Sequence, residues 1–243
     1  MRARAADEEV TRDLTRLSRK RILFGHQSVG ANILAGVQDL TVGSSPQLRV
    51  VEMKSATDLT PGTLAHVFVA ENGHPLKKLA SFERALAEAG TAPDIALMKF
   101  CYVDVSSKTD VNALFARYEE TMGRLRARYP KTIFVHVTMP LTIVQHGAKA
   151  WVKDLMGRST GVAENARRED FNARLRRTYD GKEPIFDLAR IESTRPDGSA
   201  EVSKWNGQDV PGLVSAYASD SGHLNERGRV VAARGLIGVL AAL

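Results

Sequence analysis

Cysteine and long apolar runs are both scarce in this sequence. Cys101 is the only cysteine among 243 residues, so the chain cannot form an internal disulfide or a cysteine-rich zinc site. No segment approaches the roughly 18 consecutive apolar residues that cross a membrane. The N-terminus also lacks the apolar core of a secretory signal. We therefore expect a soluble protein without a membrane span, cytoplasmic as the chain stands or exported if a signal peptide preceded Met1.

Motifs for metals and nucleotides are missing as well. His66, His74 and His146 lack the paired spacing of metal ligands, so we expect no catalytic metal and no cofactor. The segment Gly25–Gly30 has neither the dinucleotide-binding fingerprint nor the lysine of a phosphate-binding loop. These absences argue against a nucleotide-dependent protein.

Positive charge is in modest excess. The 34 lysines and arginines outnumber the 28 acidic residues, and the formal net charge is +6. An acidic partner such as a nucleic acid or an anionic polysaccharide therefore has to be considered. The densest basic runs, at 16–21, 124–131 and 167–177, share a helical pattern with apolar residues. This pattern favours solvated helix faces, so we expect no nucleic-acid partner.

The apolar pattern predicts an α/β protein. Apolar residues make up 43% of the chain and charged residues 26%, which are ordinary values for a globular protein. Runs typical of buried strands alternate with helical stripes such as Val111, Leu114, Phe115 and Tyr118. The predicted strands are Arg21–Gly25, Leu48–Met53, Asp94–Phe100, Thr132–Thr138 and Pro184–Leu188.

This alternation indicates right-handed crossovers and a parallel sheet covered on both faces. We expect a three-layer α/β/α sandwich with about five parallel strands in one domain over residues 21–243, after an amphipathic lead-in helix in residues 1–20. Ligands bind beyond the carboxyl ends of such strands. The least regular segments, Ser55–His74, Pro140–Gly161 and Ser193–Ser219, are the expected pocket walls.

A serine lies at the turn between the first predicted strand and the next helix. Ser28 follows the run Arg21–Gly25 and precedes the stripe that begins at Ile33. Its hydroxyl is expected at the carboxyl edge of the sheet, where a helix N-terminus offers free N–H groups to a developing oxyanion. Ser28 is equally well explained as an N-cap of that helix.

A carboxylate and a histidine precede the last predicted helix. In the segment 219–225, Asp220 lies three residues before His223 and is separated from it by two small residues. Such a carboxylate can turn back to hold the imidazole in one tautomer and stabilise its protonated form. The alternative is a polar turn that caps the helix, with His223 merely exposed.

Together these two segments resemble the first and last sequence blocks of the SGNH (GDSL-like) hydrolases. That family places its serine directly after the first strand and an Asp-x-x-His pair before the last helix. Ser28 and His223 are 195 residues apart, so the resemblance covers almost the whole chain. It implies that Ser28 is the nucleophile, His223 the general base and Asp220 the residue that orients it. The first block departs from the common Gly-Asp-Ser form, because His26 and Gln27 precede the serine.

The resemblance also implies an oxyanion hole, and here the match is incomplete. Gly73, which follows Asn72 in a loop, best matches the family's N–H donor, although it is nearly as well explained as a turn residue with positive φ. The third block usually ends in Gly-x-Asn-Asp. Here Asp104 matches the aspartate but no asparagine is present, so Lys99 or Tyr102 is the expected substitute.

Two further residues are candidates for a part in the chemistry. Cys101 lies near the end of a predicted strand, but no Cys-His-Asn arrangement accompanies it, which favours a buried small apolar residue. His136 lies inside another predicted strand and is expected to be a hydrogen-bonded core histidine.

The resemblance implies an ester hydrolase that forms an acyl-serine intermediate and acts on a small-molecule or carbohydrate ester. Long loops and few aromatic residues favour a carbohydrate O-acetyl ester over a long acyl chain. The alternatives are a binding module on the same fold, impaired by the missing asparagine, and a nucleic-acid-binding domain. The sequence does not indicate an oligomeric state.

Overall fold

The computed structural model describes residues 2–42, 48–145 and 160–243. Its centre is a six-stranded sheet in the order β2-β3-β1-β4-β5-β6, and every neighbouring pair is parallel. The strands are β1 (Arg21–His26), β2 (Arg49–Glu52), β3 (Thr63–Phe68), β4 (Ile95–Met98), β5 (Ile133–Val137) and β6 (Ile185–Phe186).

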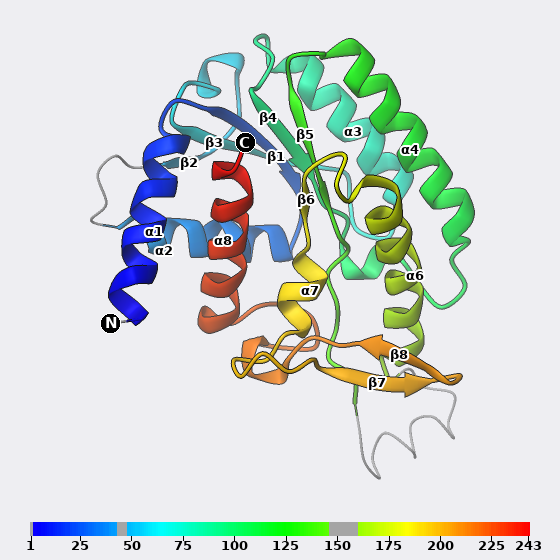
Figure 1. Ribbon diagram of the computed structural model, residues 1–243. Coiled ribbons are helices and arrows are strands. Elements are labelled where there is room, and N and C mark those ends of the chain that lie inside the picture. The colour runs from blue at the N-terminus through cyan, green and yellow to red at the C-terminus, as the bar shows by residue number, and fades with distance from the viewer. Residues whose placement is uncertain (1, 43–47, 146–159) are drawn as a thin grey trace.

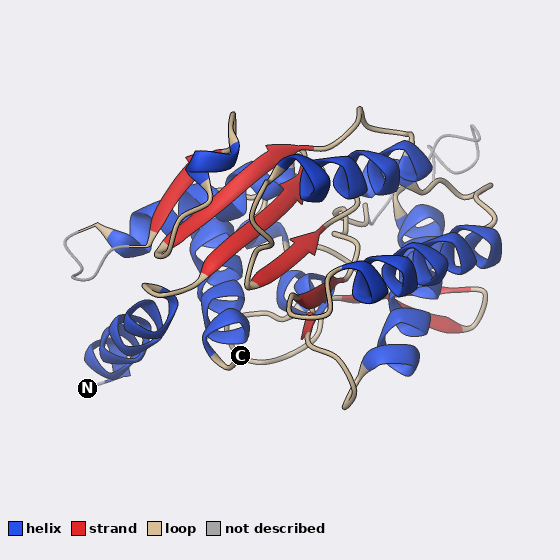
Figure 2. Ribbon diagram, turned by 90° about the horizontal axis from the view of Figure 1, so that it is seen from above, coloured by secondary structure: helices blue, strands red, loops and turns tan. Residues whose placement is uncertain are grey.

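Helices cover both faces of the sheet, as Figures 1 and 2 show. On one face lie α1 (Arg2–Leu17), α2 (Val29–Thr41) and α8 (Glu226–Ala241), with the short α7 (Leu188–Ser193) beside α8. On the other lie α3 (Pro75–Glu88), α4 (Val111–Arg128) and α6 (Val162–Tyr179). The predicted three-layer α/β/α class is therefore confirmed, with six strands in the sheet.

Each face of the sheet is buried by a separate apolar cluster. One cluster joins Leu14 of α1, Ile33 of α2 and Leu236 of α8 to the sheet. The other joins the apolar stripes of α3, α4 and α6 to the opposite face, for example through Phe115 and Phe171. Because Leu14 and Leu17 are buried in the first cluster, the lead-in helix shares the core of residues 21–243 rather than lying outside it.

Two strand regions lie in segments that the sequence pattern left irregular. The first is β3, which pairs with β1 over its whole length. The second is a small antiparallel hairpin of β7 (Val202–Trp205) and β8 (Gln208–Pro211). Its turn residues, Asn206 and Gly207, have φ values of 48° and 79°, which suit a tight hairpin turn.

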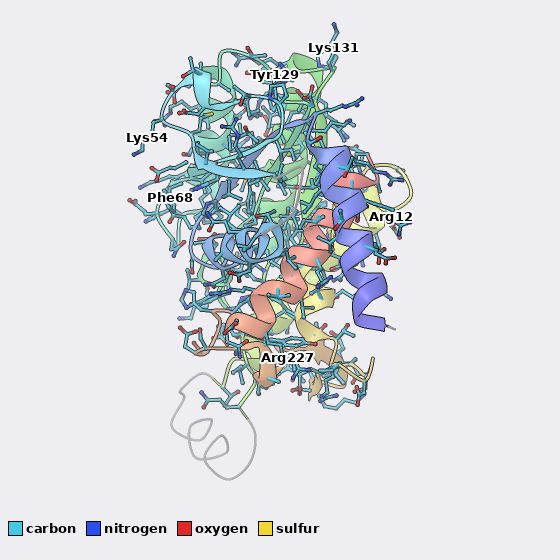
Figure 3. All side chains as sticks on the ribbon, turned by 90° about the vertical axis from the view of Figure 1, so that its left-hand side faces the viewer. Arg12, Lys54, Phe68, Tyr129, Lys131 and Arg227 are labelled. Carbon is cyan, nitrogen blue, oxygen red and sulfur yellow. The ribbon has the colours of Figure 1, made fainter. Side chains whose placement is uncertain are left out.

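In the part of the chain that the structure describes, short single-turn helices occur at three connections: η1 (Ala56–Asp58), η2 (Tyr102–Asp104) and η3 (Ser215–Tyr217). None of the helices in the described ranges is long and apolar enough to cross a bilayer. Basic side chains are spread over the surface: Arg12, Lys54, Lys131 and Arg227 project from well-separated places in Figure 3.

Candidate functional site

Ser28 occupies the turn between the central strand β1 and helix α2. Its backbone has φ 50° and ψ −108°, an uncommon conformation for a residue with a side chain. The side chain makes no capping hydrogen bond to α2. Its Oγ lies 2.5 Å from Nε2 of His223 instead, so the N-cap interpretation does not describe this serine.

His223 is held from its other side by Asp220. The distance from Nδ1 of His223 to Oδ2 of Asp220 is 2.6 Å, and the second carboxylate oxygen accepts the N–H groups of Gly222 and His223, each at 2.8 Å. These two backbone hydrogen bonds lower the pKa of Asp220 to about 2, and its bond to the imidazole adds to the effect. The carboxylate therefore remains ionised at neutral pH.

Helix α8 is capped by another residue. Asn225 accepts the N–H of Gly228 with its side chain, and its amide nitrogen donates to the carbonyls of Ala216 and Ala218. Asp220 and His223 are thus not needed as caps. The arrangement leaves them in a chain of hydrogen bonds that can take a proton from Ser28 and stabilise the resulting imidazolium.

Packing between α2 and α8 brings the segment that contains Ser28 next to the segment that contains His223. Asn32 on the first turn of α2 accepts the N–H of Leu224 at 3.1 Å, directly after His223. Farther along, Arg229 of α8 donates to Asp39 of α2 at 2.7 Å. Gly36 allows close approach, because a Cβ there would overlap the carbonyl of Arg229.

The two residues before Ser28 fix its turn to neighbouring strands. Gln27 donates its side-chain amide to the carbonyl of Val69, just beyond β3, at 2.5 Å. His26 is fully buried, and its Nε2 lies 3.0 Å from Nδ1 of His66 on β3. Burial lowers the pKa of His26 to about 3, so it is neutral at neutral pH. Gly30 completes the packing, since a Cβ there would clash with the His26 ring.

The loop that contains Gly73 is organised around a buried ion pair. The N–H of Gly73 donates to Oδ1 of Asp104 at 2.7 Å, and Lys78 donates to Oδ2 at 2.7 Å. Lys78 also donates to Oδ1 of Asn72 at 2.8 Å. Gly73 has φ 86°, and its N–H is engaged by a carboxylate, which favours the turn interpretation of this glycine. Sequence analysis missed Lys78 because an amphipathic helix pattern gives no sign that one lysine is buried.

Lys99 and Tyr102 are placed differently from each other. Lys99 is fully buried, and its ammonium nitrogen lies 3.1 Å from the carbonyl of Phe100 and 3.5 Å from Sγ of Cys101. Burial lowers the pKa of Lys99. The ring of Tyr102 instead meets the imidazole of His223 edge to face, with 5.7 Å between the ring centroids. Of the two expected substitutes, Tyr102 is the one that contacts the catalytic candidates.

A cavity of about 280 Å³ opens beside these residues. Its lining includes Tyr102 and Ser221, which lies between Asp220 and His223 in the chain. Arg168 of α6 also lines it, although this side chain belongs to a run expected to face solvent. Only 4% of Arg168 is exposed, so the solvated-face interpretation is wrong for this residue.

The remaining candidates have different surroundings. His136 is buried, with 2.7 Å from Nδ1 to the hydroxyl of Tyr118 and 3.0 Å from Nε2 to a carboxylate oxygen of Glu183, as expected of a core histidine. Cys101 is buried beside the serine turn, with its Sγ 3.7 Å from the carbonyl of Gln27. His146 lies outside the described residues. In the ranges that the structure describes, histidine, cysteine and carboxylate side chains form no group of three suited to a metal ion.

Comparison with known proteins identifies the fold. No family model and no curated protein matches the chain. Among solved structures, a Streptococcus pneumonia protein proposed to be a platelet activating factor aligns with a TM-score of 0.55 and 15% identity, covering 97% of this chain and 93% of that chain. A GDSL-like lipase from Bacteroides thetaiotaomicron gives 0.54 and 12%, covering 92% and 89%. An acetyl xylan esterase gives 0.50 and 14%, covering 89% and 98%. The expected SGNH-type fold is confirmed by these similarities.

Proposed function

We propose that this chain, which has the fold of the GDSL-like SGNH hydrolases, is a serine esterase. The observation that carries the proposal is the unbroken chain of hydrogen bonds from Ser28 through His223 to Asp220, at 2.5 and 2.6 Å. An acetyl xylan esterase and a GDSL-like lipase are among the proteins of similar structure, which supports ester hydrolysis at the level of the fold family.

The proposed reaction is acyl transfer to water. Neutral His223, protonated on Nδ1, accepts the Ser28 hydroxyl proton on Nε2 while the serine oxygen attacks the ester carbonyl. Ionised Asp220 holds that tautomer and stabilises the imidazolium. The imidazolium then gives its proton to the leaving alcohol. A water molecule repeats the cycle on the acyl-serine and restores the enzyme.

The N-terminus of α2 is the proposed source of oxyanion stabilisation. Ser28 immediately precedes this helix, whose first N–H groups and dipole carry partial positive charge. Gly73 is a weaker candidate than the sequence suggested, because its N–H donates to Asp104. The asparagine that the family uses in its oxyanion hole is also missing. The rival function is therefore a binding module with the same fold but little turnover.

The proposed substrate class is a carbohydrate O-acetyl ester or another small ester. The acetyl xylan esterase of similar fold gives a precedent for such a substrate. A small nitrophenyl acetate should therefore be hydrolysed, and because the proposed mechanism uses no metal, a chelator should leave the rate unchanged.

A fluorophosphonate probe tests the proposal directly. The wild-type protein should be labelled at Ser28 in a time-dependent reaction, and Ser28→Ala should abolish labelling. Ser107→Ala is a matched control, since Ser107 is an exposed serine outside the site, and it should be labelled like the wild type. Folded wild-type protein that resists the probe would refute the esterase proposal and favour the binding module.

A further inference from the structure

Two histidines on neighbouring strands form a hydrogen-bonded pair beside the Ser28 turn. Nε2 of His26, the last residue of β1, lies 3.0 Å from Nδ1 of His66 on β3. His26 is fully buried, whereas His66 is half-buried. The ring of Phe68, which reaches the surface in Figure 3, contacts both imidazoles, with centroid distances of 5.1 and 5.8 Å. The proposed reaction uses neither histidine directly, so the pair needs an explanation of its own.

The second nitrogen of His26 decides which tautomer is favoured. Nδ1 is buried and has no hydrogen-bond partner among the described residues. A Cβ at Gly30 would lie 2.6 Å from this nitrogen, so the first turn of α2 covers it closely. A buried N–H without an acceptor costs free energy, and proteins leave an acceptor unpaired more readily than a donor. His26 is therefore expected to carry its proton on Nε2 and to donate it to Nδ1 of His66.

Ser28 depends on anchors of this kind because its backbone is strained. A residue with a side chain at φ 50° and ψ −108° keeps that conformation only where its surroundings hold it. Gln27 anchors the turn to the carbonyl of Val69, and His26 anchors it to His66. Loss of the bond between the histidines would therefore remove one of the contacts that hold the serine in place.

His66 is the member of the pair that gains a proton first. Burial lowers the pKa of His26 to about 3, and the charges of His66 and Lys99 add to this effect. Burial also lowers the pKa of His66, but Glu52, its partner in the register of β2 and β3, acts in the opposite direction. His66 is less buried as well, so it is protonated at a higher pH than His26. The nitrogen that takes up this proton is Nδ1, which accepts the hydrogen bond from His26.

From these contacts we propose that His66 is a positioning residue for Ser28 and acts through His26. Neutral His66 accepts the hydrogen bond and holds the turn. Protonated His66 brings a second N–H against that of His26, so the rings must separate or the His26 proton must move to Nδ1, where no acceptor is present. The effect on turnover rests on the proposed esterase function, to which the inference adds a second histidine, besides His223, that must be neutral.

Two replacements of His66 test the hydrogen bond. His66→Leu removes the acceptor and should lower kcat on nitrophenyl acetate on the order of tenfold at neutral pH, with KM nearly unchanged. His66→Asn keeps an acceptor close to the place of Nδ1 and should restore kcat to within about twofold of the wild type. Leu64→Ala is the control for stability, because Leu64 is a buried apolar residue of the same strand. It should lower the melting temperature but not kcat. Equal kcat values for His66→Leu and His66→Asn, or an equal loss in Leu64→Ala, would overturn the proposal.

The pH profile gives a readout that a purely structural role would not change. Below the ordinary pKa of histidine, kcat/KM of the wild type should fall on the order of tenfold further than that of His66→Asn, because protonation withdraws the anchor only in the wild type. His74→Asn, which replaces an exposed histidine, should follow the wild type. Profiles of the wild type and His66→Asn that run parallel over the range in which both are folded would contradict the proposal.

Nuclear magnetic resonance separates this inference from the esterase proposal, because it needs no turnover. In the His223→Ala protein, the backbone amide signal of Ser28 should still move as His66 titrates, and adding His66→Asn should abolish that movement. Spectra of the histidine side chains should show His26 protonated on Nε2 at neutral pH. A Ser28 signal that ignores His66, or a proton on Nδ1 of His26, would overturn the positioning role even if the fluorophosphonate probe labels Ser28. Both expected spectra without labelling would support the positioning of Ser28 and refute the esterase alone.

Discussion

At the scale of single residues, the proposed chemistry makes Ser28 and His223 partners in one proton transfer. Ser28→Ala and His223→Ala should each remove nearly all ester hydrolysis, and the double variant should be little worse than either single variant, because residues that act as a unit do not contribute additively. Asp220→Asn should lower kcat about 10³- to 10⁴-fold, since an amide neither balances the imidazolium nor selects its tautomer. Steady-state kinetics on nitrophenyl acetate measure all four. Multiplicative losses in the double variant would show that the two side chains serve separate steps.

Gly73 gives a second prediction at this scale: a substitution there should lower stability but leave turnover almost unchanged. With φ at 86° and its N–H on Asp104, Gly73 is required by the turn. Gly73→Ala should therefore cost about 1–2 kcal/mol in the free energy of unfolding, because a side chain disfavours this conformation. We expect kcat to change less than threefold, as read from kinetics beside a urea titration. A large loss of kcat in a stably folded variant would instead indicate that Gly73 is part of the oxyanion hole.

Single residues also show where sequence reasoning reaches its limit. Ser28, Asp220 and His223 could be singled out because each follows or precedes an element whose pattern is strong. Only the family resemblance joined Ser28 to His223, because the local pattern carries no sign of a contact that depends on α2 packing against α8. Arg168 was hidden for a related reason: it neighbours Arg167, and only the packing of α6 decides that one is buried while the other is exposed.

At the scale of elements, replacing a helix glycine by alanine usually raises stability. At the contact between α2 and α8 the same replacement should lower it. Gly36→Ala would drive a methyl group into the Arg229 carbonyl and should cost about 1–3 kcal/mol of stability. At Gly238 on α8, an added methyl group would meet no atom of a neighbouring element within 4 Å, so Gly238→Ala should gain about 0.5–1 kcal/mol through helix propensity. Chemical denaturation of both variants gives the comparison. Equal gains from both substitutions would mean that the helices are less closely packed.

The elements that sequence analysis missed had weaker or overlooked signals. β3 begins directly after Pro61 and Gly62, and His66 interrupts its apolar pattern because that residue pairs with His26 inside the fold. The β7–β8 hairpin had a usable signal. Asn206 and Gly207 form the dipeptide that most often marks a two-residue hairpin turn, and it stands in a segment otherwise rich in polar residues.

At the scale of the whole molecule, a buried carboxyl group should make stability depend on pH. Glu192 is 1% exposed, and one of its oxygens accepts the N–H of Leu141 at 2.6 Å while the other has no partner among the described residues. Burial raises its pKa to about 8. Between the ordinary pKa of a glutamate and pH 8, the unfolded chain loses this proton and the folded chain keeps it. Stability should therefore fall as pH rises through that range.

Glu192→Gln should flatten this dependence, because an amide does not titrate. Its free energy of unfolding should fall less steeply than that of the wild type from pH 5 to 8, by up to about 1.4 kcal/mol per pH unit. Urea titrations at several pH values measure the two slopes, with the exposed Glu88→Gln as control. Parallel slopes for wild type and Glu192→Gln would mean that Glu192 is ionised in the folded protein.

The convergence of the first strand and the last helix has a consequence during synthesis. The ribosome adds Ser28 first, and the imidazole that the proposed reaction requires follows 195 residues later. The nascent chain therefore carries a serine without a base until the segment between β1 and α8 has been made. On the proposed mechanism, a chain that lacks His223 should not hydrolyse esters, and the capacity for hydrolysis should appear only once α8 has packed against α2.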